Sequence, residues 1–262
     1  MEMNALIKIK NLIKKNIAEF FSDFGEIFIM FFNVIKFLPR VIKDRKLIIE
    51  QMVHIGVNSS LLITVIGAFT GAIASWEISY QTAGFISVNF LGSATPKGIM
   101  IELGPVLAAL VLAGRVGASI SAELGTMKVT EQIDALESMA INPIRYLAMP
   151  RIVATTIVMP VLVVYACTIA IIGSFLVAVF LLGVPAASYM NGFRQNFDMM
   201  DITAPLVKAL CFGIAISTIG CFYGFKTTEG AHGVGLATIK SFVVASAMIL
   251  ILDSFLWNIL LG

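Results

Sequence analysis

Long hydrophobic segments separated by polar turns dominate the pattern of this chain. Gly67 and Gly71, in the first segment, have the small-xxx-small spacing that allows close helix–helix contact in membranes. The segments are continuous rather than alternating, which argues against a membrane β-barrel, and each can cross about 30 Å of hydrocarbon as a helix. We therefore predict an all-α membrane protein with five transmembrane helices. The expected spans are residues 53–76, 98–122, 152–182, 204–225 and 241–261.

The composition agrees with a membrane protein. The 262 residues are 58% hydrophobic and only 13% charged, whereas soluble domains carry about 25% charged residues. The three cysteines lie in apolar segments without metal-binding spacing, and the two histidines lie far apart. We therefore expect neither a metal site nor another cofactor in this chain.

Residues 1–50 form a basic leader ahead of a membrane domain over residues 51–262. In residues 4–24, lysine alternates with isoleucine, leucine and phenylalanine, which is typical of an amphipathic helix lying in the headgroup region. Residues 27–35 are apolar but too few to span a membrane, so we expect an interfacial segment or a shallow elbow there. A solvated basic tail is the alternative, although the aromatic residues argue against it. The interleaved apolar residues also argue against nucleic-acid binding.

The distribution of lysine and arginine predicts the orientation, because these residues concentrate on the cytoplasmic side of membrane proteins. Residues 79–97 read as an outer loop with one lysine, and five spans then place the N-terminus in the cytoplasm and the C-terminus outside. The residues assigned to the inner side are those of the leader, Lys128, Arg145, Arg151, Lys226 and Lys240, against Lys97, Arg194 and Lys208 toward the outer side.

Three ionisable residues in the predicted spans are candidates for a functional role: Glu102 and Arg115 in the second, and Asp253 in the fifth. Such residues are costly at membrane depth and usually face a cavity or a partner. Glu102 and Arg115 would lie about 20 Å apart along one helix, so they cannot pair with each other. Less specific roles stay open: snorkelling for Arg115, an acid wetted by outer water for Glu102, and an interhelix tie for Asp253.

A polar segment over residues 123–151 follows the second span. Thr130 is a candidate N-cap for a helix over about residues 130–140, whose first turn carries Glu131 and Asp134. Pro143 and Pro150 end the segment. A helix this short is marginal alone, so we infer a docking partner; a plain solvated helix is the alternative.

The chain shows no pattern typical of catalysis. It contains no G-x-x-x-x-G-K-[ST] motif for nucleotide phosphates, and no nucleophile with a neighbouring base. We therefore expect that it is not an enzyme.

The longest recognisable motifs lie between Glu102 and Arg151. They are ELGPVLAAL from Glu102, AGRVGA from Ala113, AELG from Ala122, MKVTEQIDAL from Met127 and NPIR from Asn142. With these motifs the chain resembles the MlaE/YrbE permeases, which are membrane subunits of ABC transporters that move phospholipids between the inner and outer membranes. The resemblance extends from about Val53 to the C-terminus.

The resemblance implies a homodimeric permease in the bacterial inner membrane. It implies a separate ABC ATPase on the cytoplasmic face, which would hold the ATP and magnesium, an MCE-domain substrate-binding subunit on the periplasmic side and, in many bacteria, a STAS-domain regulator. It also implies a lipid pocket framed by the first, second and fifth spans. Position 101, where proteobacterial members often carry arginine, is isoleucine here.

The resemblance also assigns candidate residues. For the lipid pocket it gives Glu102, and from the depth of Glu102 we expect the phospholipid headgroup to lie near Glu102, Trp76, Glu77 and Tyr80. For coupling to the ATPase, they are Thr130, Glu131, Gln132, Ile133, Asp134, Leu136, Glu137 and Met139.

Two other functions stay open at this stage. The first is an ion-coupled carrier or channel in which Glu102, Arg115 and Asp253 act as a relay. The second is a membrane scaffold that transports nothing and holds a partner through residues 130–140.

Overall fold

The computed structural model describes residues 22–82, 89–228 and 230–260. The predicted amphipathic segment 4–24 therefore lies mostly outside the described residues, as do residues 261 and 262. Within the described ranges the chain forms helices joined by turns, without a strand, which confirms the all-α class.

Five helical stretches of the described chain are long and apolar enough to cross a membrane, as predicted. They are Arg45–Gln81, Leu91–Val129, Ile144–Leu181, Met200–Phe225 and Gly230–Leu260. The first, fourth and fifth are α2 (Arg45–Thr82), α9 (Met200–Phe225) and α10 (Gly230–Leu260). The second combines α3 (Asn89–Gly98), η2 (Ile99–Leu103), α4 (Gly104–Leu112), η3 (Ala113–Gly117) and α5 (Ala118–Val129). The third combines η4 (Ile144–Ala148), α7 (Met149–Leu176) and η5 (Val177–Leu181).

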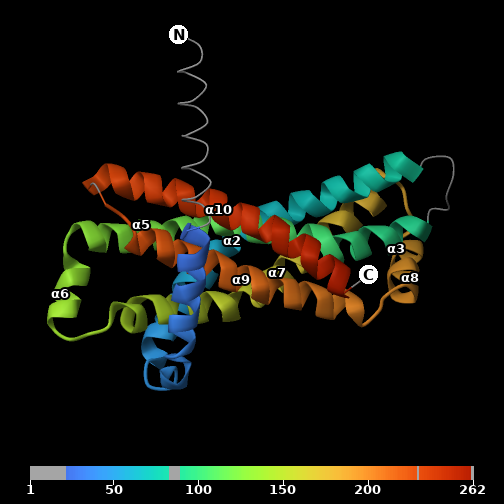
Figure 1. The fold of residues 1–262 in the computed structure, drawn as a ribbon. Coiled ribbons are helices and arrows are strands. Elements are labelled where there is room, and N and C mark those ends of the chain that lie inside the picture. Colours follow the sequence, from blue (N-terminus) through green and yellow to red (C-terminus); the bar gives the residue numbers. More distant parts are fainter. Residues whose placement is uncertain (1–21, 83–88, 229, 261–262) are drawn as a thin grey trace, which may run out of the picture.

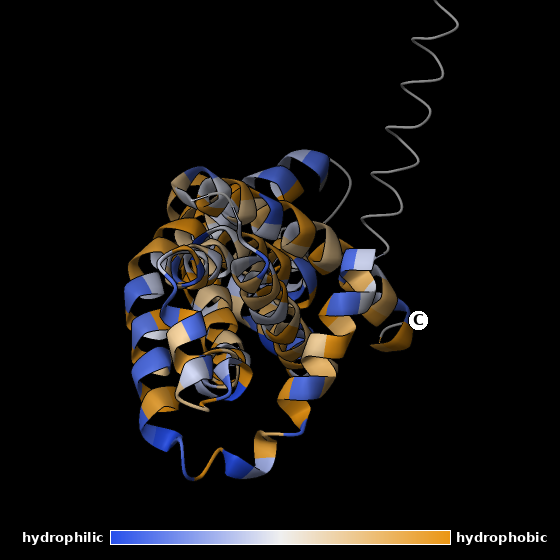
Figure 2. Cartoon of the chain, turned by 60° about the vertical axis from the view of Figure 1, so that its left-hand side comes forward, coloured by the Kyte–Doolittle hydropathy of each residue, from blue (hydrophilic) through white to orange (hydrophobic). Residues whose placement is uncertain are grey.

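Short helices mark the two ends of the bundle (Figure 1). α6 (Gln132–Ser138) joins the second and third spans at one end, called here the α6 end. α8 (Ala186–Gln195) follows the third span at the other end, called the α8 end. In Figure 2, where the α6 end is turned toward the viewer, hydrophilic residues follow the turns and hydrophobic residues dominate the long helices.

The expected outer loop over residues 79–97 is wrong at both ends, because α2 continues to Thr82 and α3 occupies Asn89–Gly98 and continues into the second span. α3 packs closely on α8: a Cβ added to Gly92 would lie 2.3 Å from the backbone oxygen of Tyr189. The Tyr189 side chain is buried, and its hydroxyl lies 2.5 Å from that of Ser174. Tertiary packing therefore makes a helix of a stretch that is too rich in Gly, Ser, Thr and Pro to predict one.

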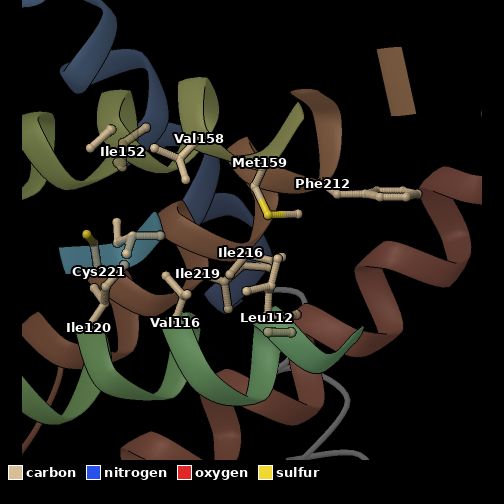
Figure 3. Packing of buried hydrophobic residues seen from close by; sticks show 14 of the residues in the cluster. Leu112, Val116, Ile120, Ile152, Val158, Met159, Phe212, Ile216, Ile219 and Cys221 are labelled. Carbon is tan, nitrogen blue, oxygen red and sulfur yellow. The ribbon is translucent and has the colours of Figure 1, made fainter. Parts of the chain in front are cut away.

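The core lies among the second, third and fourth spans. In Figure 3, the buried side chains of Leu112, Val116 and Ile120 from the second span face Ile216 and Ile219 of α9. These apolar contacts hold the second span against α9 and so position the polar residues that the same two helices carry.

Glycine brings α2 and α7 together. A Cβ on Gly71 would lie 1.7 Å from the backbone oxygen of Ala170, and one on Gly173 would lie 2.5 Å from that of Ala68. No side chain fits at either contact, so the close approach predicted from Gly71 is observed, with α7 as the partner.

The short helix predicted before the first span is present over residues 22–35 and runs across α9 and α10 (Figure 1). Ile27, Met30 and Val34 are buried against the bundle. The chain then turns through a 3₁₀ helix at Leu38–Arg40, which contains Pro39, and enters α2 at Arg45. The helix over residues 22–35 is called the N-terminal helix below.

Candidate functional site

Two π-helical turns interrupt the second span, and each holds an ionisable residue. Glu102 lies in η2 and Arg115 in η3. Pro105 explains the first turn: it has no N–H to donate to the carbonyl of Ile101, and the N–H of Gly104 bonds instead to Ile99 O in the wider pattern. Such turns are frequent at functional sites.

Lys208 of α9 is the centre of a buried charge cluster. Its Nζ lies 2.6 Å from Oε2 of Glu102 and 2.7 Å from Oδ1 of Asp253 in α10. The first contact is a hydrogen bond, and the second is an ion pair without hydrogen-bond alignment. Glu102, Lys208 and Asp253 are called the acidic cluster below, because two carboxylates face one ammonium group.

The members of the acidic cluster differ in exposure. Lys208 is fully buried and the side chain of Asp253 is 11% exposed, whereas that of Glu102 is 39% exposed. A buried ammonium group requires opposite charge nearby to offset its lost hydration, and the ring of Trp257, centred 5.3 Å from Nζ, adds a cation–π contact. Glu102 is therefore the member that a ligand can reach.

The other residues predicted for the lipid pocket lie on α2. Trp76 and Tyr80 are 57% and 80% exposed, and Glu77 is exposed and accepts a hydrogen bond from Gln81. Within the described residues, no hydrogen bond or ion pair joins these three side chains to Glu102. The single chain thus brings Glu102 together with Asp253, through Lys208, and leaves the α2 residues on its surface.

Lys208 was missed as a site residue, because the sequence assigned it only to the outer end of the fourth span. A signal was nevertheless present. Glu102 and Asp253 are acids within apolar spans, and each acid requires a cation nearby. Lys208 lies within the apolar stretch of the fourth span and could supply that cation. A lysine near the outer end of a span is ordinarily explained by the membrane surface, but the side chain of Lys208 is 0% exposed.

Arg115 belongs to a second polar group, nearer the α6 end. Its guanidinium donates to the hydroxyl of Ser59 in α2. It lines a cavity of about 150 Å³ together with neutral, acidic and apolar residues of α2 and the second span, namely Gln51, His54, Ile55, Val116, Ser119, Ile120 and Glu123. Arg115 therefore faces a cavity and a polar partner, and it is not part of the acidic cluster.

Glu123 ties this cavity to the third span. One of its carboxylate oxygens accepts from Ser119 at 3.1 Å, and the other accepts from Arg151 at 3.1 Å. Arg151 is 8% exposed and also donates to Leu147 O. Arg115, Ser59, Glu123 and Arg151, with the cavity that two of them line, are called the arginine group below.

The short helix predicted over about residues 130–140 exists as α6, with narrower limits and a different start. Thr130 does not cap it: its hydroxyl donates to Thr126 O, and no side chain caps the helix. Glu131 is the residue before the helix and has a left-handed backbone, with φ of 59°. The turn from α5 into α6 thus depends on backbone geometry rather than on a threonine cap.

The side chains of α6 divide into a buried and an exposed set. Ile133 is 3% exposed and Leu136 is half-buried against the core. The exposed residues of the helix are Gln132, Asp134, Ala135, Glu137 and Ser138, and Met139 directly after it is also exposed. Asp134 also forms an ion pair with Lys128 at 2.6 Å. α6 therefore presents a mixed polar surface on a helix that is anchored by two apolar residues.

Within the described residues, no group of three or more histidine, cysteine, aspartate or glutamate side chains is placed to hold a metal ion. A family model described as Permease MlaE matches residues 48–259. The chain belongs to the MlaE permease family. This membership confirms the resemblance seen in the motifs from Glu102 to Arg151, and it agrees with a permease rather than an enzyme.

Similar proteins cover nearly the whole MlaE-family chain. A probable ABC transporter permease protein of Rickettsia typhi is 36% identical over 255 residues, which are 97% of this chain and 98% of the relative. The intermembrane phospholipid transport system permease protein MlaE of Haemophilus influenzae is 33% identical over 258 residues, 98% of this chain and 99% of the relative. A probable ABC transporter permease protein of Synechocystis is 33% identical over 213 residues, 81% of each chain.

Proposed function

We propose that this chain is the permease subunit of an ABC transporter that moves phospholipids between the inner and outer membranes. The observation that carries the proposal is the similarity, along 98% of the chain, to a protein named as an intermembrane phospholipid transport permease. Five candidate spans and an acid at membrane depth in the second are what such a permease requires.

The lipid pocket forms between two copies of the chain, around the first, second and fifth spans. α2 supports this arrangement, since Leu61, Phe69 and Ile73 are each more than 60% exposed along it. In the homodimer these surfaces line the acyl chains, and Glu102 takes the headgroup together with Trp76, Glu77 and Tyr80.

A separate ATPase docks on α6 and supplies the energy of ATP hydrolysis, with ATP and magnesium bound to that partner. Two features of α6 support this. Its exposed polar residues can contact a docked subunit, and Ile133 and Leu136 pack against the core, so a movement of α6 would reach the core. A short helix gains stability from such a partner.

The α6 end faces the cytoplasm of a bacterium and the α8 end faces the periplasm, with the N-terminus inside and the C-terminus outside. Lys128, Arg145, Lys226 and Lys240 near the α6 end support this orientation. An MCE-domain subunit then meets the α8 end, and a STAS-domain regulator acts on the ATPase.

Reconstitution tests the proposal. The chain and its genetically neighbouring ATPase and MCE subunits are placed in liposomes with a fluorescent phospholipid. We expect lipid movement that requires ATP and stops when the ATPase cannot hydrolyse it. Movement that persists without the ATPase and follows a proton gradient would select the ion-coupled carrier. A purified assembly that neither binds nor moves lipid would select the scaffold.

A further inference from the structure

An apolar groove lies under the N-terminal helix, and its lining includes Leu252, the residue before Asp253 of the acidic cluster. It has a volume of about 240 Å³, and none of its lining residues belongs to either group. Ile27, Phe28 and Phe31 form one wall, and α9 and α10 form the other with Cys211, Ile214, Ala215, Thr218, Ile219, Met248 and Leu252. Because α9 and α10 are candidate membrane spans, this groove opens toward hydrocarbon rather than water.

A polar cavity of about 420 Å³ lies on the same three helices, closer to the α6 end. It is lined by Asp23 of the N-terminal helix, by the end of α9 and the turn after it, and by the start of α10, including Lys226, Thr227, Thr228 and Lys240. Lys226 is held by Asp23 at 2.7 Å and Glu26 at 2.9 Å. Lys240 is exposed at the rim of the cavity, where it can bind an additional anion.

The spacing of the two spaces along α10 matches an amphipathic ligand. Lys240 lines the polar cavity and Met248 lines the groove, which places them about 12 Å apart along the helix axis. The polar cavity is lined by the end of one candidate span and the start of the next, and the groove is lined by residues farther along both helices. A phosphate bound at the cavity would therefore direct an acyl chain into the groove.

We propose that the N-terminal helix and the α9–α10 pair hold one phospholipid, with its phosphate at Lys240 and one acyl chain in the groove. An unfilled apolar groove would lose dispersion contacts along its whole lining. Lysine near the membrane surface attracts anionic lipid. None of the lining residues is among those assigned to the proposed transport pocket, so the site does not depend on the transport proposal. A lipid bound there would join the leader to the membrane domain.

Quenching by brominated lipids tests the proposal in the full-length chain. The two native tryptophans are replaced by phenylalanine, and Phe31→Trp places a reporter in the groove. Liposomes contain brominated phosphatidylglycerol or brominated phosphatidylcholine in an unbrominated background. We expect stronger quenching by phosphatidylglycerol, and we expect Lys240→Gln to reduce its relative affinity by about fivefold, the contribution of one lysine near the surface.

A second variant tests the acyl chain. Ala215→Phe fills the groove, and we expect it to reduce quenching by both lipids. The matched control is Val161→Phe on α7, which is 65% exposed and does not line the groove, and quenching should be unchanged. All variants are compared only after they elute from size exclusion like the parent chain.

Two outcomes would overturn the site. In the first outcome, both lipids quench equally, and neither Lys240→Gln nor Ala215→Phe changes the quenching. The groove would then be in contact with ordinary annular lipid and would not be a specific site. The lack of quenching by either lipid would show that protein, including residues 1–21 of this chain, fills the groove. Transport is assayed separately, so failure here leaves the proposed transport function standing, and failure of transport leaves this result standing.

Discussion

The acidic cluster and the arginine group are both built on a π-turn of the second span, and they hold their charges differently. In the acidic cluster the cation, Lys208, is 0% exposed between two carboxylates. In the arginine group the cation in the π-turn, Arg115, bonds to a neutral hydroxyl and lines a cavity. In the acidic cluster, Lys208 and Asp253 form a buried interhelix tie and Glu102 stays partly exposed, whereas the cation of the arginine group itself faces a cavity.

The difference shows that similar local geometry permits different roles. A π-turn widens the helix and re-aims one side chain, but the neighbouring helices decide what that side chain meets. α9 and α10 place Lys208 and Asp253 beside Glu102, whereas α2 places the hydroxyl of Ser59 beside Arg115. Stability should therefore depend more on the acidic cluster than on Arg115.

The largest effect is expected from Lys208→Met. It leaves two carboxylates without their cation inside the bundle, which should destabilise the protein by about 3–5 kcal/mol. Thermal unfolding of the purified chain measures the loss. Adding Glu102→Gln and Asp253→Asn should recover most of it, since no buried charge then remains unpaired. A triple variant as unstable as Lys208→Met would show that packing, rather than charge, fixes this position.

Arg115→Met should cost less, about 1–2 kcal/mol, because it removes one hydrogen bond at a cavity and leaves no unpaired charge. The same thermal assay measures it, with Arg115→Lys as the charge-preserving control. A loss equal to that of Lys208→Met would remove the distinction between the two groups.

A further contrast concerns how ATP hydrolysis in the partner is coupled through α6 to lipid movement. Leu136→Ala should cost less than about 2 kcal/mol in stability, since the side chain is only half-buried. In the reconstituted transporter, however, we expect Leu136→Ala to uncouple the two activities, so that less lipid is moved for each ATP hydrolysed. We expect the same of Glu131→Ala. Ser138→Ala, an exposed change on the same helix, is the control. Unchanged transport in both variants would count against α6 as the docking helix.

The smallest effect is expected at the N-terminal helix. Partial burial works to lower the pKa of Lys226, but its hydrogen bonds to Asp23 and Glu26 outweigh this and raise the pKa above the ordinary 10.5. A raised folded-state pKa gives a stabilisation that is complete below the ordinary value and is lost as the pH rises through the raised value. Because Lys226 is 45% exposed, solvent screening keeps this contribution small.

The Phe31→Trp reporter measures this dependence. Its emission should stay constant up to about pH 10 and shift toward the red above it as the N-terminal helix loosens. Lys226→Gln should show the shifted emission already at neutral pH. An emission that depends on pH equally in both forms would assign the change to another group.

Some site residues could be predicted from the sequence because a charged side chain is unusual in an apolar segment. Glu102 and Asp253 were identified as acids in apolar segments, and both belong to the acidic cluster. Lys208 was not, because a lysine near the end of a span is ordinarily explained by the membrane surface. Thr130 was wrongly expected to cap α6, because the same hydroxyl can bond backward to Thr126 O.

The sequence by itself determined the class of the protein, its five apolar helices and the position of the polar segment that contains α6. These follow from local composition, because a lipid environment requires long apolar stretches whose backbone is satisfied internally. Only the tertiary structure decided that α3 is helical, and that Glu102, Lys208 and Asp253 meet while Arg115 stays apart. Those outcomes depend on which helices lie side by side, and burial and pairing of charge are properties of that neighbourhood rather than of any one segment.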